Sequence, residues 1–203
     1  MARIIPEDNS DWFNNHLDLS TMSVYLSGAT KWENDGDDDD VTVSMAQNCI
    51  KAFHKIAQYD PKGEREVTVY LNTQGGDVDA GLAIYDCIRR CNSHVVMVGT
   101  GRVMSIGTII LQAADQRVLT PNTTVMIHKG TYGHYGHPND THNWTDYARR
   151  QFTLVNSLLL TRIKEKHPKF TASKLSKLQQ FDHLMTAQGA LDLGLADFIW
   201  EGV

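Results

Sequence analysis

Short apolar strands alternate with amphipathic helices along most of this chain of 203 residues. Residues Val67 to Leu71 are β-branched and apolar, which predicts a buried strand. Ile84 and Ile88 then recur at helical spacing, and residues 94–99 form the next apolar run of strand length. Repeated alternation of this kind is typical of the α/β class, and no repeat or linker divides the sequence. We therefore expect a single α/β domain over residues 1–203.

The same periodicities predict the remaining elements. Further strands are expected at residues 23–26, 117–119 and 124–127 and near Phe198. Further helices are expected at residues 45–57, 105–113, 144–166 and 186–194, and the length of the third indicates an arm that packs beyond the domain. Turns are expected at residues 72–76, before an N-cap at Asp77, and at 99–101, where the preceding strand should end. Residues 128–143 are rich in Gly, His, Asn and Tyr, which is typical of an exposed loop.

Charge and composition argue against several classes of function. The net charge is −5 and no basic patch stands out, which argues against nucleic-acid binding. Much of the acidity lies between Glu33 and Asp40, and such a run of like charge predicts a solvated loop. Calcium binding there is poorly supported, because the run lacks the spaced ligands and closing glutamate of a calcium loop.

Cysteine usage and hydropathy predict a soluble, cytoplasmic protein. Three cysteines, Cys49, Cys87 and Cys91, do not make a disulfide framework, and the last two look like small core residues of one helix. The N-terminal residues lack the long apolar region of a secretory signal. No apolar run approaches the ~18 residues that span a membrane.

The pair Gly75-Gly76 stands between a buried strand and the start of a helix. Glycine lets a backbone approach a ligand closely, and amides at a helix start favour developing negative charge. These are the requirements of an oxyanion hole. An ordinary strand-to-helix turn is the alternative interpretation.

Ser105 also lies between a predicted strand and a predicted helix, within Gly101-Arg-Val-Met-Ser-Ile-Gly107. A serine at a rigid turn is a candidate nucleophile, although Val103 rules out the Gly-x-Ser-x-Gly elbow. A plain helix N-cap is the alternative, and the local sequence favours it. His128, at the end of the apolar strand 124–127, is a candidate base for a serine hydroxyl or a hydrogen-bonded histidine at a strand end.

Four segments in this order resemble the proteolytic subunit of the Clp protease. They are residues 69–86 around the glycine pair, Met104-Ser-Ile-Gly107, Pro121-Asn-Thr-Thr-Val-Met-Ile-His128 and residues 184–197. The resemblance covers about Ser23 to Ile199. It implies a crotonase-like fold of repeated ββα units, with the helix from about residue 144 to 166 as a protruding handle.

The same resemblance implies a serine endopeptidase that needs no metal or organic cofactor. It assigns Ser105 as nucleophile, His128 as general base, and the amides of Gly76 and Ile106 as the oxyanion hole. It further implies heptameric rings stacked in pairs as a tetradecamer, and an AAA+ unfoldase that consumes ATP and delivers unfolded polypeptides. Tyr70 stands where the family has an aromatic residue in the docking pocket for the unfoldase.

The third member of the triad departs from the family pattern. Counting back from Leu184 without a gap, the family's aspartate falls on Leu178, which cannot accept a hydrogen bond from the imidazole. Asp182 is the nearest carboxylate and Gln179 the nearest polar side chain. Asp182 is therefore the candidate third member, with Gln179 or no third member as alternatives.

Two other functions follow from this departure and from the fold. Because of Leu178, the chain could be a weakly active or inactive ring subunit that assembles with another Clp peptidase. The crotonase-like fold also supports acyl-CoA hydratases and isomerases, although no glutamate occurs between Glu66 and Asn122.

Smaller departures surround the glycine pair and the serine. Gln74 replaces the proline usual before the glycines, and Arg102, Val103 and Met104 replace small residues before Ser105. His134, His137 and His142 fit no standard metal-binding spacing, so we expect no metal there.

Overall fold

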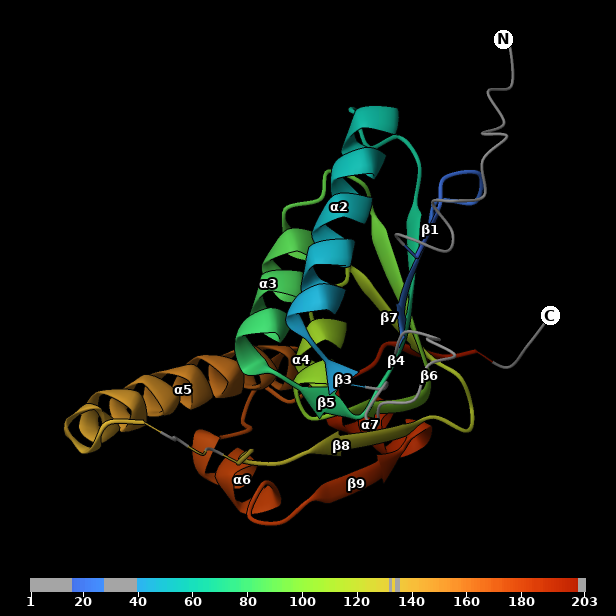
Figure 1. The fold of residues 1–203 in the computed structure, drawn as a ribbon. Helices are drawn as coiled ribbons and strands as arrows, with labels where there is room; N and C mark the ends of the chain where they lie inside the picture. Colours follow the sequence, from blue (N-terminus) through green and yellow to red (C-terminus); the bar gives the residue numbers. More distant parts are fainter. Residues whose placement is uncertain (1–15, 28–39, 132, 134–135, 201–203) are drawn as a thin grey trace, which may run out of the picture.

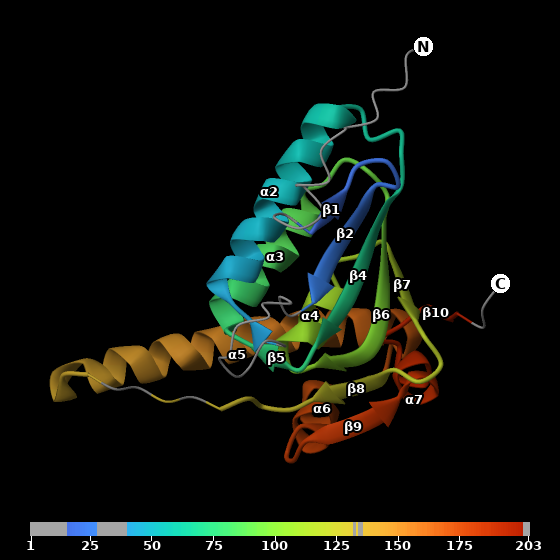
Figure 2. The ribbon, with the colours of Figure 1, turned by 45° about the vertical axis from the view of Figure 1, so that its right-hand side comes forward.

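The computed structural model describes residues 16–27, 40–131, 133 and 136–200. Within these residues, eight strands form one sheet whose neighbours run mostly parallel, as the α/β class predicts (Figures 1 and 2). Its main path is β1 (Leu17–Asp18), β2 (Ser23–Ser27), β4 (Val67–Thr73), β6 (Val95–Met104), β7 (Gln116–Leu119) and β10 (Phe198–Ile199). The α/β prediction is confirmed.

Helices α2 (Val43–Tyr59) and α3 (Val78–Arg89) lie side by side along one face of the sheet (Figure 1). Each begins where the sequence supplies a cap, because the side chains of Thr42 and Asp77 accept hydrogen bonds from backbone N–H groups one turn on. Alternate residues of β4 are buried, as its period of two requires, and they join the apolar sides of α2 and α3 in one core.

Strand β6 is longer than the sequence indicated, because it changes partners along its length. On one side its partner changes from β7, along Val96–Gly99, to β8 (Thr124–Ile127), along Arg102–Met104, whereas on the other side it stays paired with β4 as far as Val103. The predicted end at residues 99–101 is therefore wrong, since the glycines allow the strand to bend between its partners. Strand β8 pairs in turn, antiparallel, with β9 (His183–Thr186), which was not predicted.

The turn predicted at residues 72–76 is wrong in both halves. Strand β4 continues to Thr73, and Gly75-Gly76 forms the short strand β5, parallel to β3 (Asp40–Val41). The Asp77 N–H extends this pairing by donating to the carbonyl oxygen of Val41, 2.8 Å away. Two glycines have little β propensity, so this strand exists because of its partner.

Helix α5 (Thr141–Lys166) projects from the sheet as a long arm (Figures 1 and 2). The turn η1 (Pro138–Asp140) leads into it, so the predicted loop at 128–143 is shorter than expected and the helix begins earlier. The helix has 26 residues and spans about 39 Å at the usual rise per residue. The remaining helices are α4 (Ile106–Leu111), α6 (Ala172–Leu178), which was not predicted, and α7 (Ala187–Leu193).

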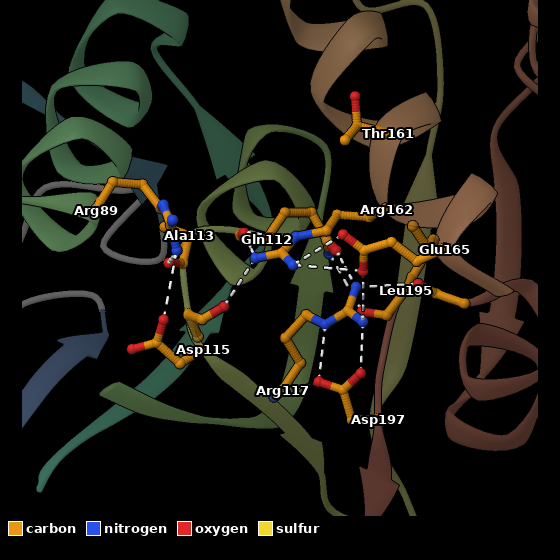
Figure 3. Close-up of polar contacts among 12 residues, drawn as sticks. Arg89, Gln112, Ala113, Asp115, Arg117, Thr161, Arg162, Glu165, Leu195 and Asp197 are labelled. Atoms are coloured by element: carbon orange, nitrogen blue, oxygen red, sulfur yellow. Dashed lines mark hydrogen bonds and ion pairs between the residues drawn. The ribbon is translucent and has the colours of Figure 1, made fainter. Parts of the chain in front are cut away.

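A buried polar network fixes the base of this arm (Figure 3). The guanidinium of Arg117 on β7 donates to both carboxylate oxygens of Asp197 and, at 2.7 Å, to Oε1 of Gln112. From α5, Arg162 donates to the backbone carbonyl oxygens of Gln112 and Ala114, at 2.9 and 3.0 Å. These bonds join β7, the end of α4, the base of α5 and the C-terminal segment.

Other sequence predictions concern the acidic run, the cysteines and membrane spans. Residues 33–39 of the acidic run lie outside the described residues. Cys49 is buried, and Cys87 and Cys91 are partly buried against the core, all three as free thiols. In the part of the chain that the structure describes, no helix has the length and apolar character to cross a membrane.

Candidate active site

Ser105 joins the end of β6 to the start of α4 in a conformation that few non-glycine residues adopt. Its φ is 52° and its ψ is −124°. Such backbone strain costs about 1–3 kcal/mol and is concentrated at functional sites. Ser105 occupies the N-cap position of α4, but its side chain makes no capping hydrogen bond. Ser105 is therefore the N-cap of α4 by position, but its side chain does not cap the helix.

The strained turn is tied to both strands beside it. The Ser105 N–H donates to the carbonyl oxygen of Met126 on β8, 2.9 Å away. The hydroxyl of Thr108 lies 3.0 Å from the carbonyl oxygen of Val103 and 2.9 Å from that of Met126. The sequence analysis did not identify Thr108. The feature that could have indicated it is its polar side chain within an otherwise apolar helix.

Ser105, His128 and Asp182 form a hydrogen-bonded line. Ser105 Oγ lies 2.8 Å from His128 Nε2, and His128 Nδ1 lies 3.1 Å from Asp182 Oδ1. The register of β8 and β9 pairs Ile127 with His183, so that the residue following one strand faces the residue preceding the other. Serine, imidazole and carboxylate in this order have the geometry of a nucleophile, its base and the group that orients the base.

The three residues weighed as orienting group have different surroundings. The side chain of Asp182 is 68% exposed, and it reaches His128, which is 23% exposed. Leu178 ends α6 and lines a separate cavity of about 760 Å³. The amide nitrogen of Gln179 donates to Oδ1 of Asn156 on α5, 2.9 Å away. Asp182 is thus the one of the three that hydrogen-bonds His128 in the described structure.

The glycine pair lies against Ser105 with backbone angles that only glycine adopts easily. Gly75 has a φ of +115° and Gly76 a φ of +139°. A Cβ atom on Gly75 would lie 2.6 Å from the Ser105 Cβ, and one on Gly76 would lie 2.5 Å from the carbonyl oxygen of Val41. Both positions therefore require glycine, one because of Ser105 and the other because of β3.

The predicted oxyanion hole uses the amides of Gly76 and Ile106. Ile106 is the first residue of α4, and N–H groups in the first turn of a helix have no partner within it. Helix α4 packs against β5, which contains Gly76. The two amides thus belong to adjoining elements beside Ser105, and their role stays a prediction.

Tyr70 lies on β4, away from Ser105, and forms a stacked pair with Tyr25 of β2. Their ring centroids are 5.1 Å apart and their planes differ by 11°. Burial raises the pKa of the Tyr25 hydroxyl above its ordinary value. The docking of an unfoldase at Tyr70 stays a prediction.

The histidines from the end of β8 to the first turn of α5 show no metal-binding arrangement in the described part of the chain. His134 lies outside the described residues. His142 is close to the Asp146 carboxylate, 3.3 Å away, and His137 Nδ1 accepts a hydrogen bond from the backbone of Asn139. Among the residues that the structure describes, no three His, Cys, Asp or Glu side chains cluster as metal ligands would.

Comparisons with known proteins agree with one another. A family model described as Clp protease matches residues 38–202. The ATP-dependent Clp protease proteolytic subunit of Deinococcus radiodurans is 35% identical over 160 residues, which cover 77% of this chain and 74% of the relative. The ATP-dependent Clp protease proteolytic subunit 6, chloroplastic, of Arabidopsis thaliana is 33% identical over 79% of this chain and 58% of the relative. The ATP-dependent Clp protease proteolytic subunit 1 of Leifsonia xyli subsp. xyli is 32% identical, over 72% of each chain.

Proposed function

The chain belongs to the Clp protease family, and on that premise we propose that it is a serine-type proteolytic subunit of a Clp protease with Ser105 as nucleophile. The observation that carries the proposal is the hydrogen bond of 2.8 Å between Ser105 Oγ and His128 Nε2. Ser105 occupies the N-cap position but does not use its hydroxyl to cap the helix. The hydroxyl contacts an imidazole instead, as that of a nucleophilic serine does.

The proposed reaction is acyl transfer. Ser105 Oγ attacks the carbonyl carbon of a peptide bond while His128 Nε2 accepts the hydroxyl proton. The amides of Gly76 and Ile106 stabilise the oxyanion of the tetrahedral intermediate. His128 then donates the proton to the leaving amine, and water, activated by the same imidazole, releases the acyl group from Ser105.

Asp182 is the proposed orienting group of His128. Its carboxylate lies 3.1 Å from Nδ1, so it favours the tautomer that leaves Nε2 free to accept the serine proton. The carboxylate also stabilises the imidazolium that forms during attack. With Asp182 in this role, the chain needs no carboxylate at position 178, where it has Leu178. The names of the relatives favour neither an inactive subunit nor an acyl-CoA enzyme.

The assembly is a second part of the proposal. We infer heptameric rings joined through helix α5 into a tetradecamer, in the cytoplasm, with an AAA+ unfoldase docked near Tyr70. The unfoldase would hydrolyse ATP and feed unfolded polypeptides into the chamber. The relatives' names support an ATP-dependent complex, and the exposed Trp144 and Leu154 on the projecting helix offer apolar contacts to another subunit.

A fluorophosphonate probe tests the nucleophile directly. The assembled wild-type chain is expected to be labelled on Ser105, and Ser105→Ala to be unlabelled and inactive on fluorogenic peptides. Ser157→Ala, which removes an exposed hydroxyl on α5, is the matched control and is expected to keep both properties. An assembled wild-type chain that is not labelled would contradict the proposal, and sedimentation of the same sample measures the assembly.

A further inference from the structure

The cavity that Leu178 lines is separate from the proposed catalytic residues. It measures about 760 Å³, which is within the range of sites that enclose most of a drug-sized molecule. Its walls come from the end of α5 and the segment after it, and from α6, β9 and α7, which lie close together (Figure 2). Ser105 and His128 border a different and smaller cavity, so the proposed acyl transfer does not use this one.

Apolar side chains form the inner walls of this cavity. They belong to Phe170, Leu178, Met185 and Leu193. Met185 is part of the hydrophobic core, and Phe170 and Leu193 pack against it, so the cavity is a recess in the surface of the core. Gly189 on α7 also borders the cavity and, having no side chain, leaves space there. An apolar recess of this kind favours an apolar ligand group.

Two basic residues beside the cavity hold its walls in place. Lys166 Nζ donates to the carbonyl oxygen of Leu191, 2.8 Å away, and His167 Nε2 donates to that of Asp192, 2.7 Å away. Both oxygens are at the C-terminal end of α7, where hydrogen-bond donors and positive charge are favourable. These bonds join the end of α5 to α7, so the walls are fixed without a ligand.

Two further lysines, Lys169 and Lys174, border the same cavity. Neither ammonium group has a hydrogen-bond or ion-pair partner within the described part of the chain. Lys174 and Leu178 are four residues apart on α6 and share one face of it, so this charge stands at the edge of the apolar wall. The acidic residue of the lining, Asp192, accepts a hydrogen bond from Gln188 Nε2, 2.9 Å away. On a chain with a net charge of −5, this basic edge favours an anionic group.

The backbone around the cavity offers little to a peptide. The N–H of Gly189 donates to Thr186 Oγ1, 3.2 Å away, and that of Phe170 donates to the carbonyl oxygen of His167, 2.8 Å away. A peptide brings N–H and C=O groups that need partners, and these backbone donors are already engaged. A hydrocarbon chain has no such groups, so it loses no hydrogen bond by entering an apolar recess.

We propose that this cavity binds a long-chain carboxylate of the fatty-acid class. Its hydrocarbon chain lies along Phe170, Leu178 and Met185, and its carboxylate lies beside Lys169 and Lys174. This site goes beyond the proposed function and does not depend on it. Leu178 contributes to the site, because the aspartate that the family pattern places at this position would bring a negative charge into the wall.

Isothermal titration of the whole chain with dodecanoate tests the proposal. We expect one dodecanoate to bind per chain, with an affinity that falls about fourfold for each methylene removed from the ligand. Dodecyltrimethylammonium has the same hydrocarbon chain and the opposite charge, and we expect it to bind about tenfold more weakly. Ser105→Ala should bind dodecanoate as the wild-type chain does, because Ser105 borders the other cavity.

Substitutions in the wall and at its edge locate the bound ligand. Gly189→Leu should abolish binding by filling the recess, and a Cβ there would lie 3.4 Å from the Met185 Cβ, an ordinary contact. Leu178→Asp should weaken dodecanoate binding by more than about tenfold and weaken binding of the cation less. Lys174→Gln should weaken dodecanoate binding about threefold and leave the affinity for the cation unreduced. Lys51→Gln, at an exposed lysine of α2, is the matched control and should change neither.

The inference is overturned if dodecanoate shows no saturable binding, if the cation binds equally well, or if Gly189→Leu and Leu178→Asp bind dodecanoate with wild-type affinity. Displacement of dodecanoate by an equal concentration of an acidic peptide would assign the cavity to peptides, which also overturns it. Circular dichroism checks that each variant is folded, and Lys174→Gln carries the test if the two wall variants are not. None of these results bears on the proposed function, which the fluorophosphonate probe tests separately.

Discussion

Two of the aspartates that pair with a positively charged or protonatable side chain, Asp182 and Asp197, have opposite surroundings. Asp182 contacts His128 at the open end of the sheet, where the carboxylate is mostly exposed. Asp197 binds Arg117 at the base of α5, where the side chains are 32% and 6% exposed. The first pair makes one hydrogen bond, whereas Arg117 also donates to Gln112 and to a backbone carbonyl oxygen.

The difference in burial indicates that the Asp182–His128 pair contributes little to stability, whereas the Asp197–Arg117 pair stabilises the fold. An exposed pair adds little to stability, so Asp182 is free to serve the imidazole. A buried pair would be costly to leave half-made, so Arg117 and Asp197 hold the segments around them together. Burial raises the pKa of Asp197, but the hydrogen bonds and charge of Arg117 outweigh burial, and the pKa lies below its usual value.

The largest expected effect concerns Asp182. Asp182→Asn should lower kcat on a fluorogenic peptide by about 10⁴-fold, because the amide favours the wrong tautomer of His128. The free energy of unfolding should change by less than about 0.5 kcal/mol, because the carboxylate is exposed. Asp146→Asn, at another exposed His–Asp pair, is the control and should leave kcat unchanged. An unaltered kcat in Asp182→Asn would remove Asp182 from the mechanism.

The second prediction concerns Arg117, where we expect a large effect on stability. Arg117→Met removes the guanidinium donors of the Asp197 carboxylate and of Gln112 Oε1, and leaves the carboxylate the backbone N–H of residue 117, so unfolding in urea should become easier by about 3–5 kcal/mol. Arg149→Met, at a guanidinium that is 74% exposed, should cost less than about 0.5 kcal/mol. A loss below about 1 kcal/mol for Arg117→Met would mean that the network does not stabilise the fold.

The third prediction concerns the backbone of the glycine pair beside Ser105. Gly75→Ala forces a side chain into a φ of +115° and against the Ser105 Cβ atom. Displacing the nucleophile in this way should reduce kcat by about 10²-fold and destabilise the fold by about 1–3 kcal/mol. Gly133→Ala is the matched control, since a Cβ there meets no atom within 4 Å. Full activity in Gly75→Ala would show that the serine tolerates movement.

The smallest expected effect is the pH dependence that Asp197 adds. Because its folded pKa is lower than its unfolded pKa, its contribution is fully present above pH ~4 and is lost as pH falls through the folded pKa. The urea unfolding free energy of the wild-type chain should therefore fall between pH 5 and 3, and it should fall less in Asp197→Asn. Parallel pH curves for the two chains would contradict the assignment.

The sequence predicts helices and strands correctly where apolar residues recur with a regular period. It does not predict strands that form only because a neighbouring strand pairs with them. Helices α2 and α3 and strand β4 follow from regular spacing of apolar residues. Strand β5 consists of two glycines, which carry no such signal, and β9 shows too little alternation in four residues. Both exist because β3 and β8 offer them a partner.

The same distinction applies to the site. Ser105 and His128 were identified by their order after the glycine pair and by the resemblance of the segments around them, both of which a sequence displays. Asp182 was one of several candidates, since its approach to His128 depends on the β8–β9 register rather than on spacing along the chain. The hydrogen bond from Gln179 to Asn156 has no signal in the sequence, because contacts between residues far apart in the chain are properties of the folded chain.

The pairing of β8 with β9 has a consequence for how the protein is made. Asp182 is separated from His128 by 54 positions, among them the whole of α5 and α6. Since a ribosome releases the N-terminal part first, Ser105 and His128 emerge well before the carboxylate that orients them. On the proposed roles, a nascent subunit acquires the orienting carboxylate of His128 only when β9 has joined β8.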